Sequence, residues 1–160
     1  MPTEHPFDTY AEYRRAVLEL LRSARQTIVL FDPDLSQTGI ESLHGAEAIA
    51  AFCERTTFPE SLRIALHSPR YVERECPRLL RLVSQFGHRI TIRITSARFR
   101  NQEQPFLVVD GEHYVTRFHQ DDPRGKLCME DGEGAATLLS HFEILWQHAR
   151  PGPTGTPLGI

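Results

Sequence analysis

The sequence of residues 104–118 is QPFLVVDGEHYVTRF, which predicts two β-strands joined by a tight turn. Residues 106–109 form a short apolar run, long enough for a buried strand and too short for a helix. Asp110-Gly111 is a strong turn signal, because glycine adopts positive φ without steric cost. From residue 114 to residue 118 the side chains alternate, which predicts a second strand with one face more buried.

The segments on either side of this hairpin predict alternating helices and strands. The expected helices are residues 8–24 with Asp8 as N-cap, residues 45–55, a helical stretch from Ser68 that breaks at Pro77, and residues 131–149. The other expected strands are residues 27–31, 62–67, 89–95 and a last one at 126–129. This order predicts an α/β fold, a mixed sheet flanked by helices. The first three strands are expected to be parallel and the hairpin antiparallel.

The composition of the 160 residues is that of a globular protein, with 40% hydrophobic and 24% charged residues. A net charge of −3 provides no field that attracts nucleic acid, so nucleic acid is not expected as a partner. No apolar run approaches about 18 residues, and we expect no membrane span and no leader. Three widely spaced cysteines, expected as buried free thiols, favour a cytoplasmic protein. We expect one domain over residues 1–150 and a flexible tail over residues 151–160.

The hairpin and its flanks resemble one half of a phospholipase D-like protein, over about residues 10–146. In that family a hydrophobic strand carries a His and a Lys at the spacing H-x-K-x4-D. With Asp110 as the Asp, the His position is Glu103 and the Lys position is Pro105. The second family motif, Gly-Ser-x-Asn, falls on residues 117–120, where Phe118 takes the Ser position and Gln120 takes the Asn position.

The resemblance implies an inherited fold without the family's catalytic pair. In the family the His attacks phosphorus, and the Lys and Asn hold the phosphate oxygens. Glu103 would repel a phosphodiester, and Pro105 has no side-chain donor. Bacterial members with a single half pair about a two-fold axis, so the resemblance also implies a homodimer. We therefore interpret the chain as a non-catalytic, homodimeric binding or scaffolding module, with a protein or a phosphate-bearing small molecule as partner.

An enzyme with a relocated site is the alternative interpretation. His119 as nucleophile and Lys126 as phosphate binder would make a chemically sensible phosphodiesterase or phosphotransferase. The simpler explanation of residues 120–125 is turn chemistry. A third interpretation is an unrelated flavodoxin-like α/β domain, which the strand order would distinguish.

Polar side chains also follow the first three expected strands. Asp32 and Asp34, then His67 and Ser68, then Thr95 and Ser96 stand where ligands favour an open α/β sheet, unless they serve only as caps and turns. Arg98 and Arg100 form a basic run that suits a phosphate or carboxylate, or a solvated face. The candidate binding residues are thus Asp32, Asp34, His67, Ser68, Arg98, Arg100, Gln120 and Asp122. No motif predicts a metal site or a cofactor.

Overall fold

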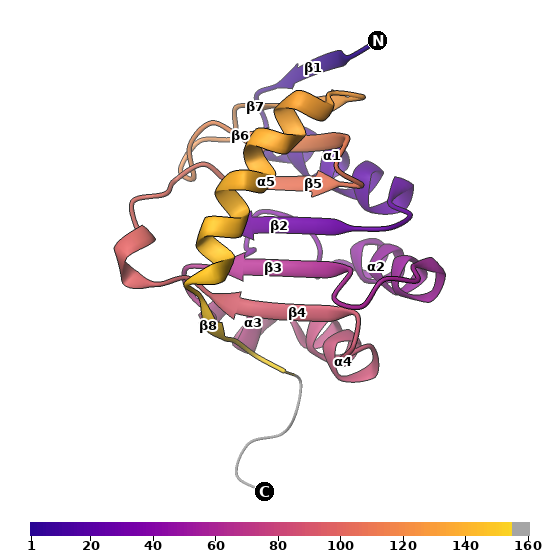
Figure 1. Cartoon of the computed structure of the whole chain (residues 1–160), viewed down its shortest axis with the longest axis vertical. Coiled ribbons are helices and arrows are strands. Elements are labelled where there is room, and N and C mark those ends of the chain that lie inside the picture. The colour runs from indigo at the N-terminus through magenta and orange to yellow at the C-terminus, as the bar shows by residue number, and fades with distance from the viewer. Residues whose placement is uncertain (155–160) are drawn as a thin grey trace, which may run out of the picture.

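One mixed sheet of eight strands runs through the computed structural model, which describes residues 1–154 (Figure 1). The strand order is β1-β7-β6-β5-β2-β3-β4-β8. The strands are β1 (Thr3–Phe7), β2 (Ile28–Asp32), β3 (Leu62–Leu66), β4 (Ile90–Ile94), β5 (Phe106–Val109), β6 (His113–Arg117), β7 (Gly125–Met129) and β8 (Arg150–Pro151). The β2–β3 and β3–β4 pairs are parallel and the β5–β6 hairpin is antiparallel, as the sequence predicts.

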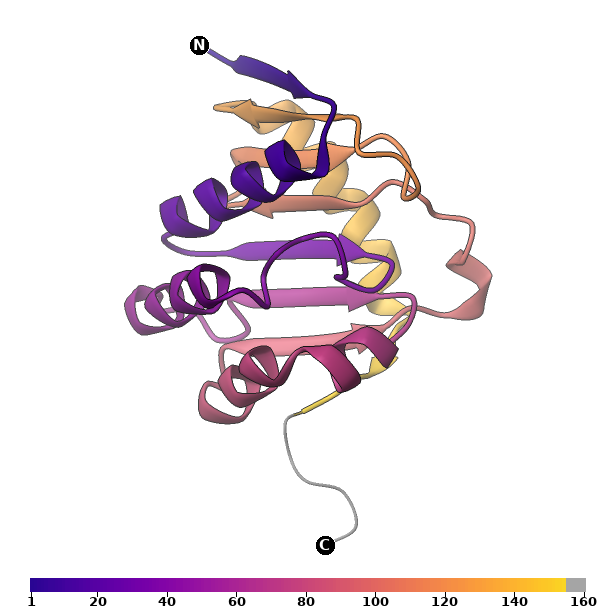
Figure 2. The same ribbon diagram turned by 180° about the vertical axis from the view of Figure 1, so that it is seen from behind.

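Helices cover the two faces of the sheet unequally. Figures 1 and 2 show four helices on one face, α1 (Tyr10–Ser23), α2 (Leu43–Arg55), α3 (Arg70–Glu75) and α4 (Pro77–Gln85). A single helix, α5 (Gly132–Gln147), crosses the other face obliquely. Alternation along each strand feeds two cores. In β2, Ile28 and Leu30 join the core under α1 to α4, while Val29 and Phe31 join the core under α5.

The helices and central strands lie where the sequence predicts them, with small differences at their ends. The N-cap of α1 is Thr9, whose hydroxyl accepts from Glu12 N, and not Asp8. The predicted break at Pro77 separates α3 from α4, because proline is tolerated in the first turn of a helix and not in its interior. The edge strands β1 and β8 were not predicted, since they are short, polar and exposed.

The C-terminal segment begins as part of the sheet. Pro151 lies in β8 and pairs with β4, although the expected tail starts at this residue. Residues 155–160, the rest of that tail, lie outside the described residues. The three cysteines are buried and free, as predicted. Within residues 1–154, none of the helices has the length and apolar character needed to cross a membrane.

Candidate functional site

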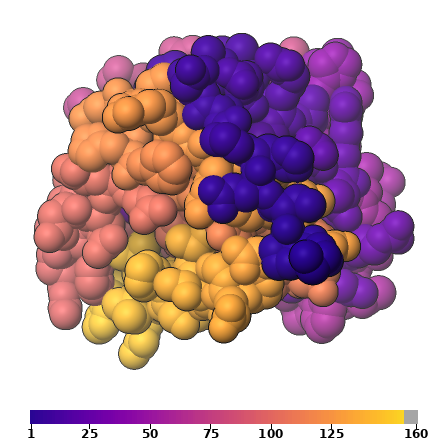
Figure 3. Space-filling view, turned by 90° about the horizontal axis from the view of Figure 1, so that it is seen from above, coloured from indigo at the N-terminus to yellow at the C-terminus, as the bar shows by residue number. Residues whose placement is uncertain are grey.

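The carboxyl ends of β2, β3 and β4 and the loops around the hairpin meet at one edge of the sheet. We call this place the carboxyl edge and define it by residues 32–35, 67–68, 95–104 and 117–124. Seen from above in Figure 3, the salmon-coloured atoms near residue 100 and the orange atoms near residue 120 lie side by side. A close polar contact between His119 Nε2 and Glu103 Oε2 joins these two loops. All of the candidate site residues except Lys126 lie at this edge.

The alternation of side chains divides the expected cleft into two clusters. Asp32 pairs in register with Leu66, and Leu66 with Ile94, so the Asp32 side chain shares their face of the sheet, under α1 to α4. His67 follows one residue later and faces the α5 side, where its ring meets Phe31 edge-on at 5.1 Å. A one-residue offset is enough to separate the two, because the period of a strand is two.

The first cluster is built on a buried ion pair. Asp32 and Arg117 are each 1% exposed, and Arg117 Nη2 lies 3.4 Å from Asp32 Oδ1. The other carboxylate oxygen accepts from Leu35 N at 2.6 Å and from Asp34 N at 3.1 Å. Burial raises the pKa of Asp32 to about 6, against the lowering effect of the two N–H donors and of Arg117. The pair is thus a cation and an anion that neutralise one another inside the protein.

Arg117 also holds the loop that follows its strand. Its Nη1 donates to the carbonyl oxygen of Gln120 at 2.9 Å and to that of Asp122 at 3.4 Å. The guanidinium lies 4.8 Å from the centre of the Tyr13 ring. Arg117 Nε and Tyr13 Oη are buried and have no partner among residues 1–154, and burial also raises the pKa of Tyr13. The sequence did not identify Arg117 as a site residue. It is a charged residue in a strand of alternating side chains, a pattern that predicts a solvent-facing position, whereas the structure buries it.

His67 forms the second cluster with both ring nitrogens engaged. Nε2 lies 2.8 Å from the carbonyl oxygen of Gln102, and Nδ1 lies 2.6 Å from Thr95 Oγ1. A carbonyl oxygen only accepts, so Nε2 carries the hydrogen and Nδ1 accepts from the threonine hydroxyl. Burial lowers the pKa of His67, which favours this neutral form.

His119 is engaged in the same way, although it is half-buried. Its Nδ1 accepts from Asp121 N at 3.1 Å, so Nε2 carries the hydrogen that meets Glu103 Oε2 at 2.6 Å. Neither His67 nor His119 therefore offers a free lone pair. An imidazole needs one to attack phosphorus.

The register of the hairpin relates these residues to the family motif. Phe106 pairs with Thr116. Continuing the same register places Pro105 across from Arg117, in agreement with the hydrogen bond from Arg117 N to Pro105 O at 3.1 Å. It also places Glu103 across from His119. A cation and a histidine thus stand on the neighbouring chain segment, opposite the positions where the family carries its Lys and His.

The remaining candidates serve the chain's own turns. Asp34 accepts from Ser36 N at 2.9 Å, and Ser68 Oγ accepts from Arg70 N at 3.3 Å. Asp122 binds Arg124 through both carboxylate oxygens, and this contact holds the pKa of Asp122 below its usual value.

The basic candidates point in different directions. Arg98 lies within the short 3-10 helix Ala97–Phe99 and Arg100 directly follows it, and both are exposed, with the Arg98 guanidinium over the Phe99 ring. Lys126, in β7, pairs with Glu4 of β1 at 3.5 Å. No ion pair or hydrogen bond links Lys126 with His119 in the described part of the chain. Residues 1–154 also contain no cluster of three or more His, Cys, Asp or Glu side chains placed to hold a metal ion.

Asp110 has a structural role at the opposite end of the hairpin. Its carboxylate accepts from the backbone N–H groups of Arg25 at 3.0 Å, Gln26 at 2.7 Å and Thr27 at 3.0 Å. It does so from a positive φ of 54°. The motif aspartate therefore joins the hairpin turn to the start of β2 and lies away from the carboxyl edge.

Comparisons with known proteins agree with this fold. A family model described as "Domain of unknown function (DUF7931)" matches residues 9–155. The chain is similar to a phospholipase D family member, Nuc from Salmonella typhimurium, with 17% identity, a TM-score of 0.69, and coverage of 94% of this chain and 98% of that one. For NucT from Helicobacter pylori the identity is 12% and the TM-score 0.63, with coverage of 94% and 99%.

A third structure is TrmBL2, an archaeal chromatin protein with a novel mode of DNA binding, at 14% identity and a TM-score of 0.68 over 92% of this chain and 54% of that one. No curated protein sequence matches the chain. The fold is therefore phospholipase D-like, as the hairpin and its flanks predict, and the flavodoxin-like alternative has no support.

Proposed function

We propose that this chain, which belongs to the DUF7931 family and has a phospholipase D-like fold, is a non-catalytic, homodimeric binding or scaffolding module. The observation that carries the proposal is the engagement of both ring nitrogens in each histidine of the carboxyl edge. Glu103 and the Asp121 N–H occupy His119, while Thr95 and the Gln102 carbonyl occupy His67.

The cation opposite the family's Lys position is not available either. A phosphodiester would need an accessible cation at that position, and Arg117 is 1% exposed and neutralised by Asp32, while Arg98 and Arg100 are exposed elsewhere on the edge. Glu103 adds a negative charge where a phosphate would bind. The chemistry left to the edge is binding through polar contacts and through Phe118, which is 57% exposed. An exposed aromatic among paired charges is typical of an interaction surface.

The test is a phosphodiesterase assay with bis(4-nitrophenyl) phosphate on the full chain, on a His119→Ala variant and on a His113→Ala control. His113 lies at the far end of β6, the strand that leads to His119, and its Nδ1 accepts from Glu130 N. We expect that none of the three proteins hydrolyses the substrate faster than it hydrolyses in buffer alone. Turnover that His119→Ala abolishes and His113→Ala retains would overturn the proposal.

The homodimeric state is tested separately, by the mass of the protein in solution. Sedimentation equilibrium should give a mass of two 18.3 kDa chains. Phe118→Ser should convert that species to the mass of one chain, whereas Ile144→Ser, at a 52% exposed site on α5, should not. A single-chain mass for the unmodified protein would remove the homodimer from the proposal.

A phosphodiesterase or phosphotransferase at the same edge is the second candidate. The register favours it, because His119 and Arg117 stand across from the family's His and Lys positions. Lys126, the phosphate binder expected from the sequence, pairs with Glu4 instead. This candidate predicts that Glu103→Gln raises phosphodiester turnover, since it removes a negative charge beside the nucleophile. The non-catalytic proposal predicts no turnover in either protein.

A further inference from the structure

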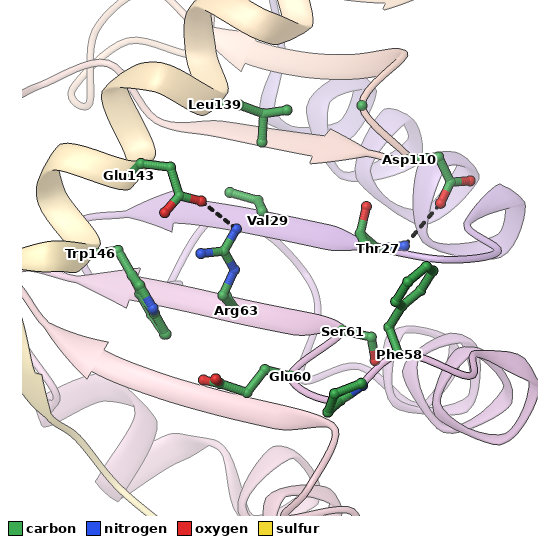
Figure 4. A pocket seen from close by; sticks show the side chains of 12 residues that line it. Thr27, Val29, Phe58, Glu60, Ser61, Arg63, Asp110, Leu139, Glu143 and Trp146 are labelled. Atoms are coloured by element: carbon green, nitrogen blue, oxygen red, sulfur yellow. Dashed lines mark hydrogen bonds and ion pairs between the residues drawn. The ribbon is translucent and has the colours of Figure 1, made fainter.

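A groove with a volume of about 510 Å³ lies at the other end of β2 and β3, on the face that α5 covers only in part (Figure 4). Its floor is formed by β2 and β3, one wall by α5, and the other by the loop of residues 58–61 and the Asp110-Gly111 turn. This volume is within the range of small-molecule sites in proteins. The groove is separate from the carboxyl edge, so what it binds does not depend on the function proposed above.

Arg63 stands in the floor of the groove as a fixed cation with unused donors. Its Nη2 donates to Glu143 Oε1 at 2.6 Å, and its side chain is 23% exposed. The guanidinium lies 5.1 Å from the centre of the Phe142 ring and 5.6 Å from that of Trp146. Within the described residues, Nε and Nη1 have no acceptor. A guanidinium packed on aromatic rings with free N–H groups at Nη1 can donate to a carboxylate, and the planar group fixes the direction of that contact.

Glu60 supplies a free negative charge in the opposite wall. Its side chain is exposed and lines the groove, and its carboxylate makes no ion pair or hydrogen bond within residues 1–154. Its backbone has a positive φ of 47°, an uncommon conformation for a residue other than glycine. The next residue, Ser61, is 2% exposed and its hydroxyl has no partner within the described residues. The second acid of this wall, Asp110, already accepts from three backbone N–H groups.

Apolar side chains lie on the side of Arg63 that is turned away from Glu60, and beside Arg63 (Figure 4). Val29 in the floor and Leu139 and Trp146 on α5 line the same groove (Figure 4). A ligand that satisfies all three features carries a carboxylate, an ammonium and an apolar group. A phosphate dianion fits poorly, because Glu60, Asp110 and Glu143 all line the groove and would repel it.

We propose that this groove binds a small zwitterion, an α-amino acid with an apolar side chain. The carboxylate binds the free donors of Arg63, the ammonium binds Glu60, and the side chain packs on Val29 and Leu139.

The test is calorimetric titration of the full chain with leucine and with two analogues that each lack one charge. Leucinamide has no carboxylate, and 4-methylpentanoate has no ammonium. We expect leucine to bind and each analogue to bind about tenfold more weakly, the factor that loss of one charge-assisted hydrogen bond produces. No heat of binding with leucine at up to about 10 mM, or equal affinity for the three compounds, would overturn the proposal.

Substitutions in the groove test which side chain binds the carboxylate of the ligand and which binds its ammonium. Glu60→Gln should weaken leucine about tenfold and leave 4-methylpentanoate unchanged, and Glu112→Gln, an exposed acid in the neighbouring turn, should change neither. Arg63→Gln should weaken leucine and 4-methylpentanoate alike. Because Arg63 also packs on Phe142 and Trp146, its variant is checked for folding by circular dichroism, and the Glu60 variant decides the question without it. Unchanged leucine affinity in Glu60→Gln would contradict the site.

Discussion

Replacement of Arg117 by Met is expected to lower the free energy of unfolding by about 3–5 kcal/mol. The side chain is 1% exposed, and its Nη2 is the cation that faces the equally buried Asp32 at 3.4 Å. Methionine retains much of the apolar stem over Tyr13 and removes the charge. The variant therefore isolates the cost of leaving a buried carboxylate without its partner.

The structure indicates where that cost arises. After the substitution, Asp32 keeps only the N–H groups of Leu35 and Asp34. The carbonyl oxygens of Gln120 and Asp122 also lose the donor that held them. Asp32→Asn should be destabilising for the reciprocal reason, because it leaves Arg117 charged and buried. The double variant should cost less than the sum of the two, with a coupling energy of about 2–3 kcal/mol.

The assay is urea unfolding of the four proteins, followed by circular dichroism at neutral pH and repeated near pH 4. Burial raises the folded-state pKa of Asp32 to about 6, above its unfolded value. The contribution of this carboxyl to stability is therefore fully present below about pH 4 and is lost as pH rises through about 6. The deficit of Arg117→Met should shrink toward pH 4, where Asp32 is protonated and needs no cation.

Arg124→Met is the matched control, since Arg124 pairs with Asp122 at the surface and should leave the unfolding curve nearly unchanged. A loss below about 1 kcal/mol for Arg117→Met at neutral pH would refute the reasoning. Strictly additive single and double variants would refute it as well, because the two side chains would then not interact.

Three further outcomes follow from the same structure. Asp110→Asn should cost about 1–2 kcal/mol in urea unfolding, because it weakens three backbone hydrogen bonds, and Glu112→Gln in the same turn should cost nothing measurable. Burial lowers the pKa of His67, so its neutral form contributes stability above about pH 6.5, and this stability is lost as pH falls through the folded-state pKa. The His67→Gln variant should not show this pH dependence of stability. In the unmodified protein, NMR titration of the His67 ring proton should show the lowered pKa. In thermal unfolding, Gly125→Ala should cost at least about 2 kcal/mol, because a Cβ there would meet the Thr116 carbonyl oxygen and the Phe7 ring. Gly132→Ala, where a Cβ meets nothing within 4 Å, should instead stabilise by about 0.5 kcal/mol, and equal effects of the two alanines would contradict the packing around β7.

Local chemistry in the sequence was enough to predict the central framework. The apolar run at residues 106–109, the Asp110-Gly111 turn and the alternation after it each act over a few residues, and they form β5, the turn and β6. Pro77 ended a helix for the same reason, since its missing N–H and its ring act on the preceding turn whatever the tertiary context. Helical and strand periods also encode which face is apolar, so the flanked mixed sheet could be predicted.

Only the tertiary structure decided which polar groups meet. Asp32 and Arg117 are separated by 85 positions and face one another because β5 lies between β2 and β6 and the registers match. The same registers placed Asp32 and His67 on opposite faces and brought Arg63 under α5 beside Glu143. The edge strands β1 and β8 likewise have no apolar pattern of their own and exist through the strands they pair with. Strand order and register depend on the simultaneous packing of the whole sheet, and no short segment carries that information.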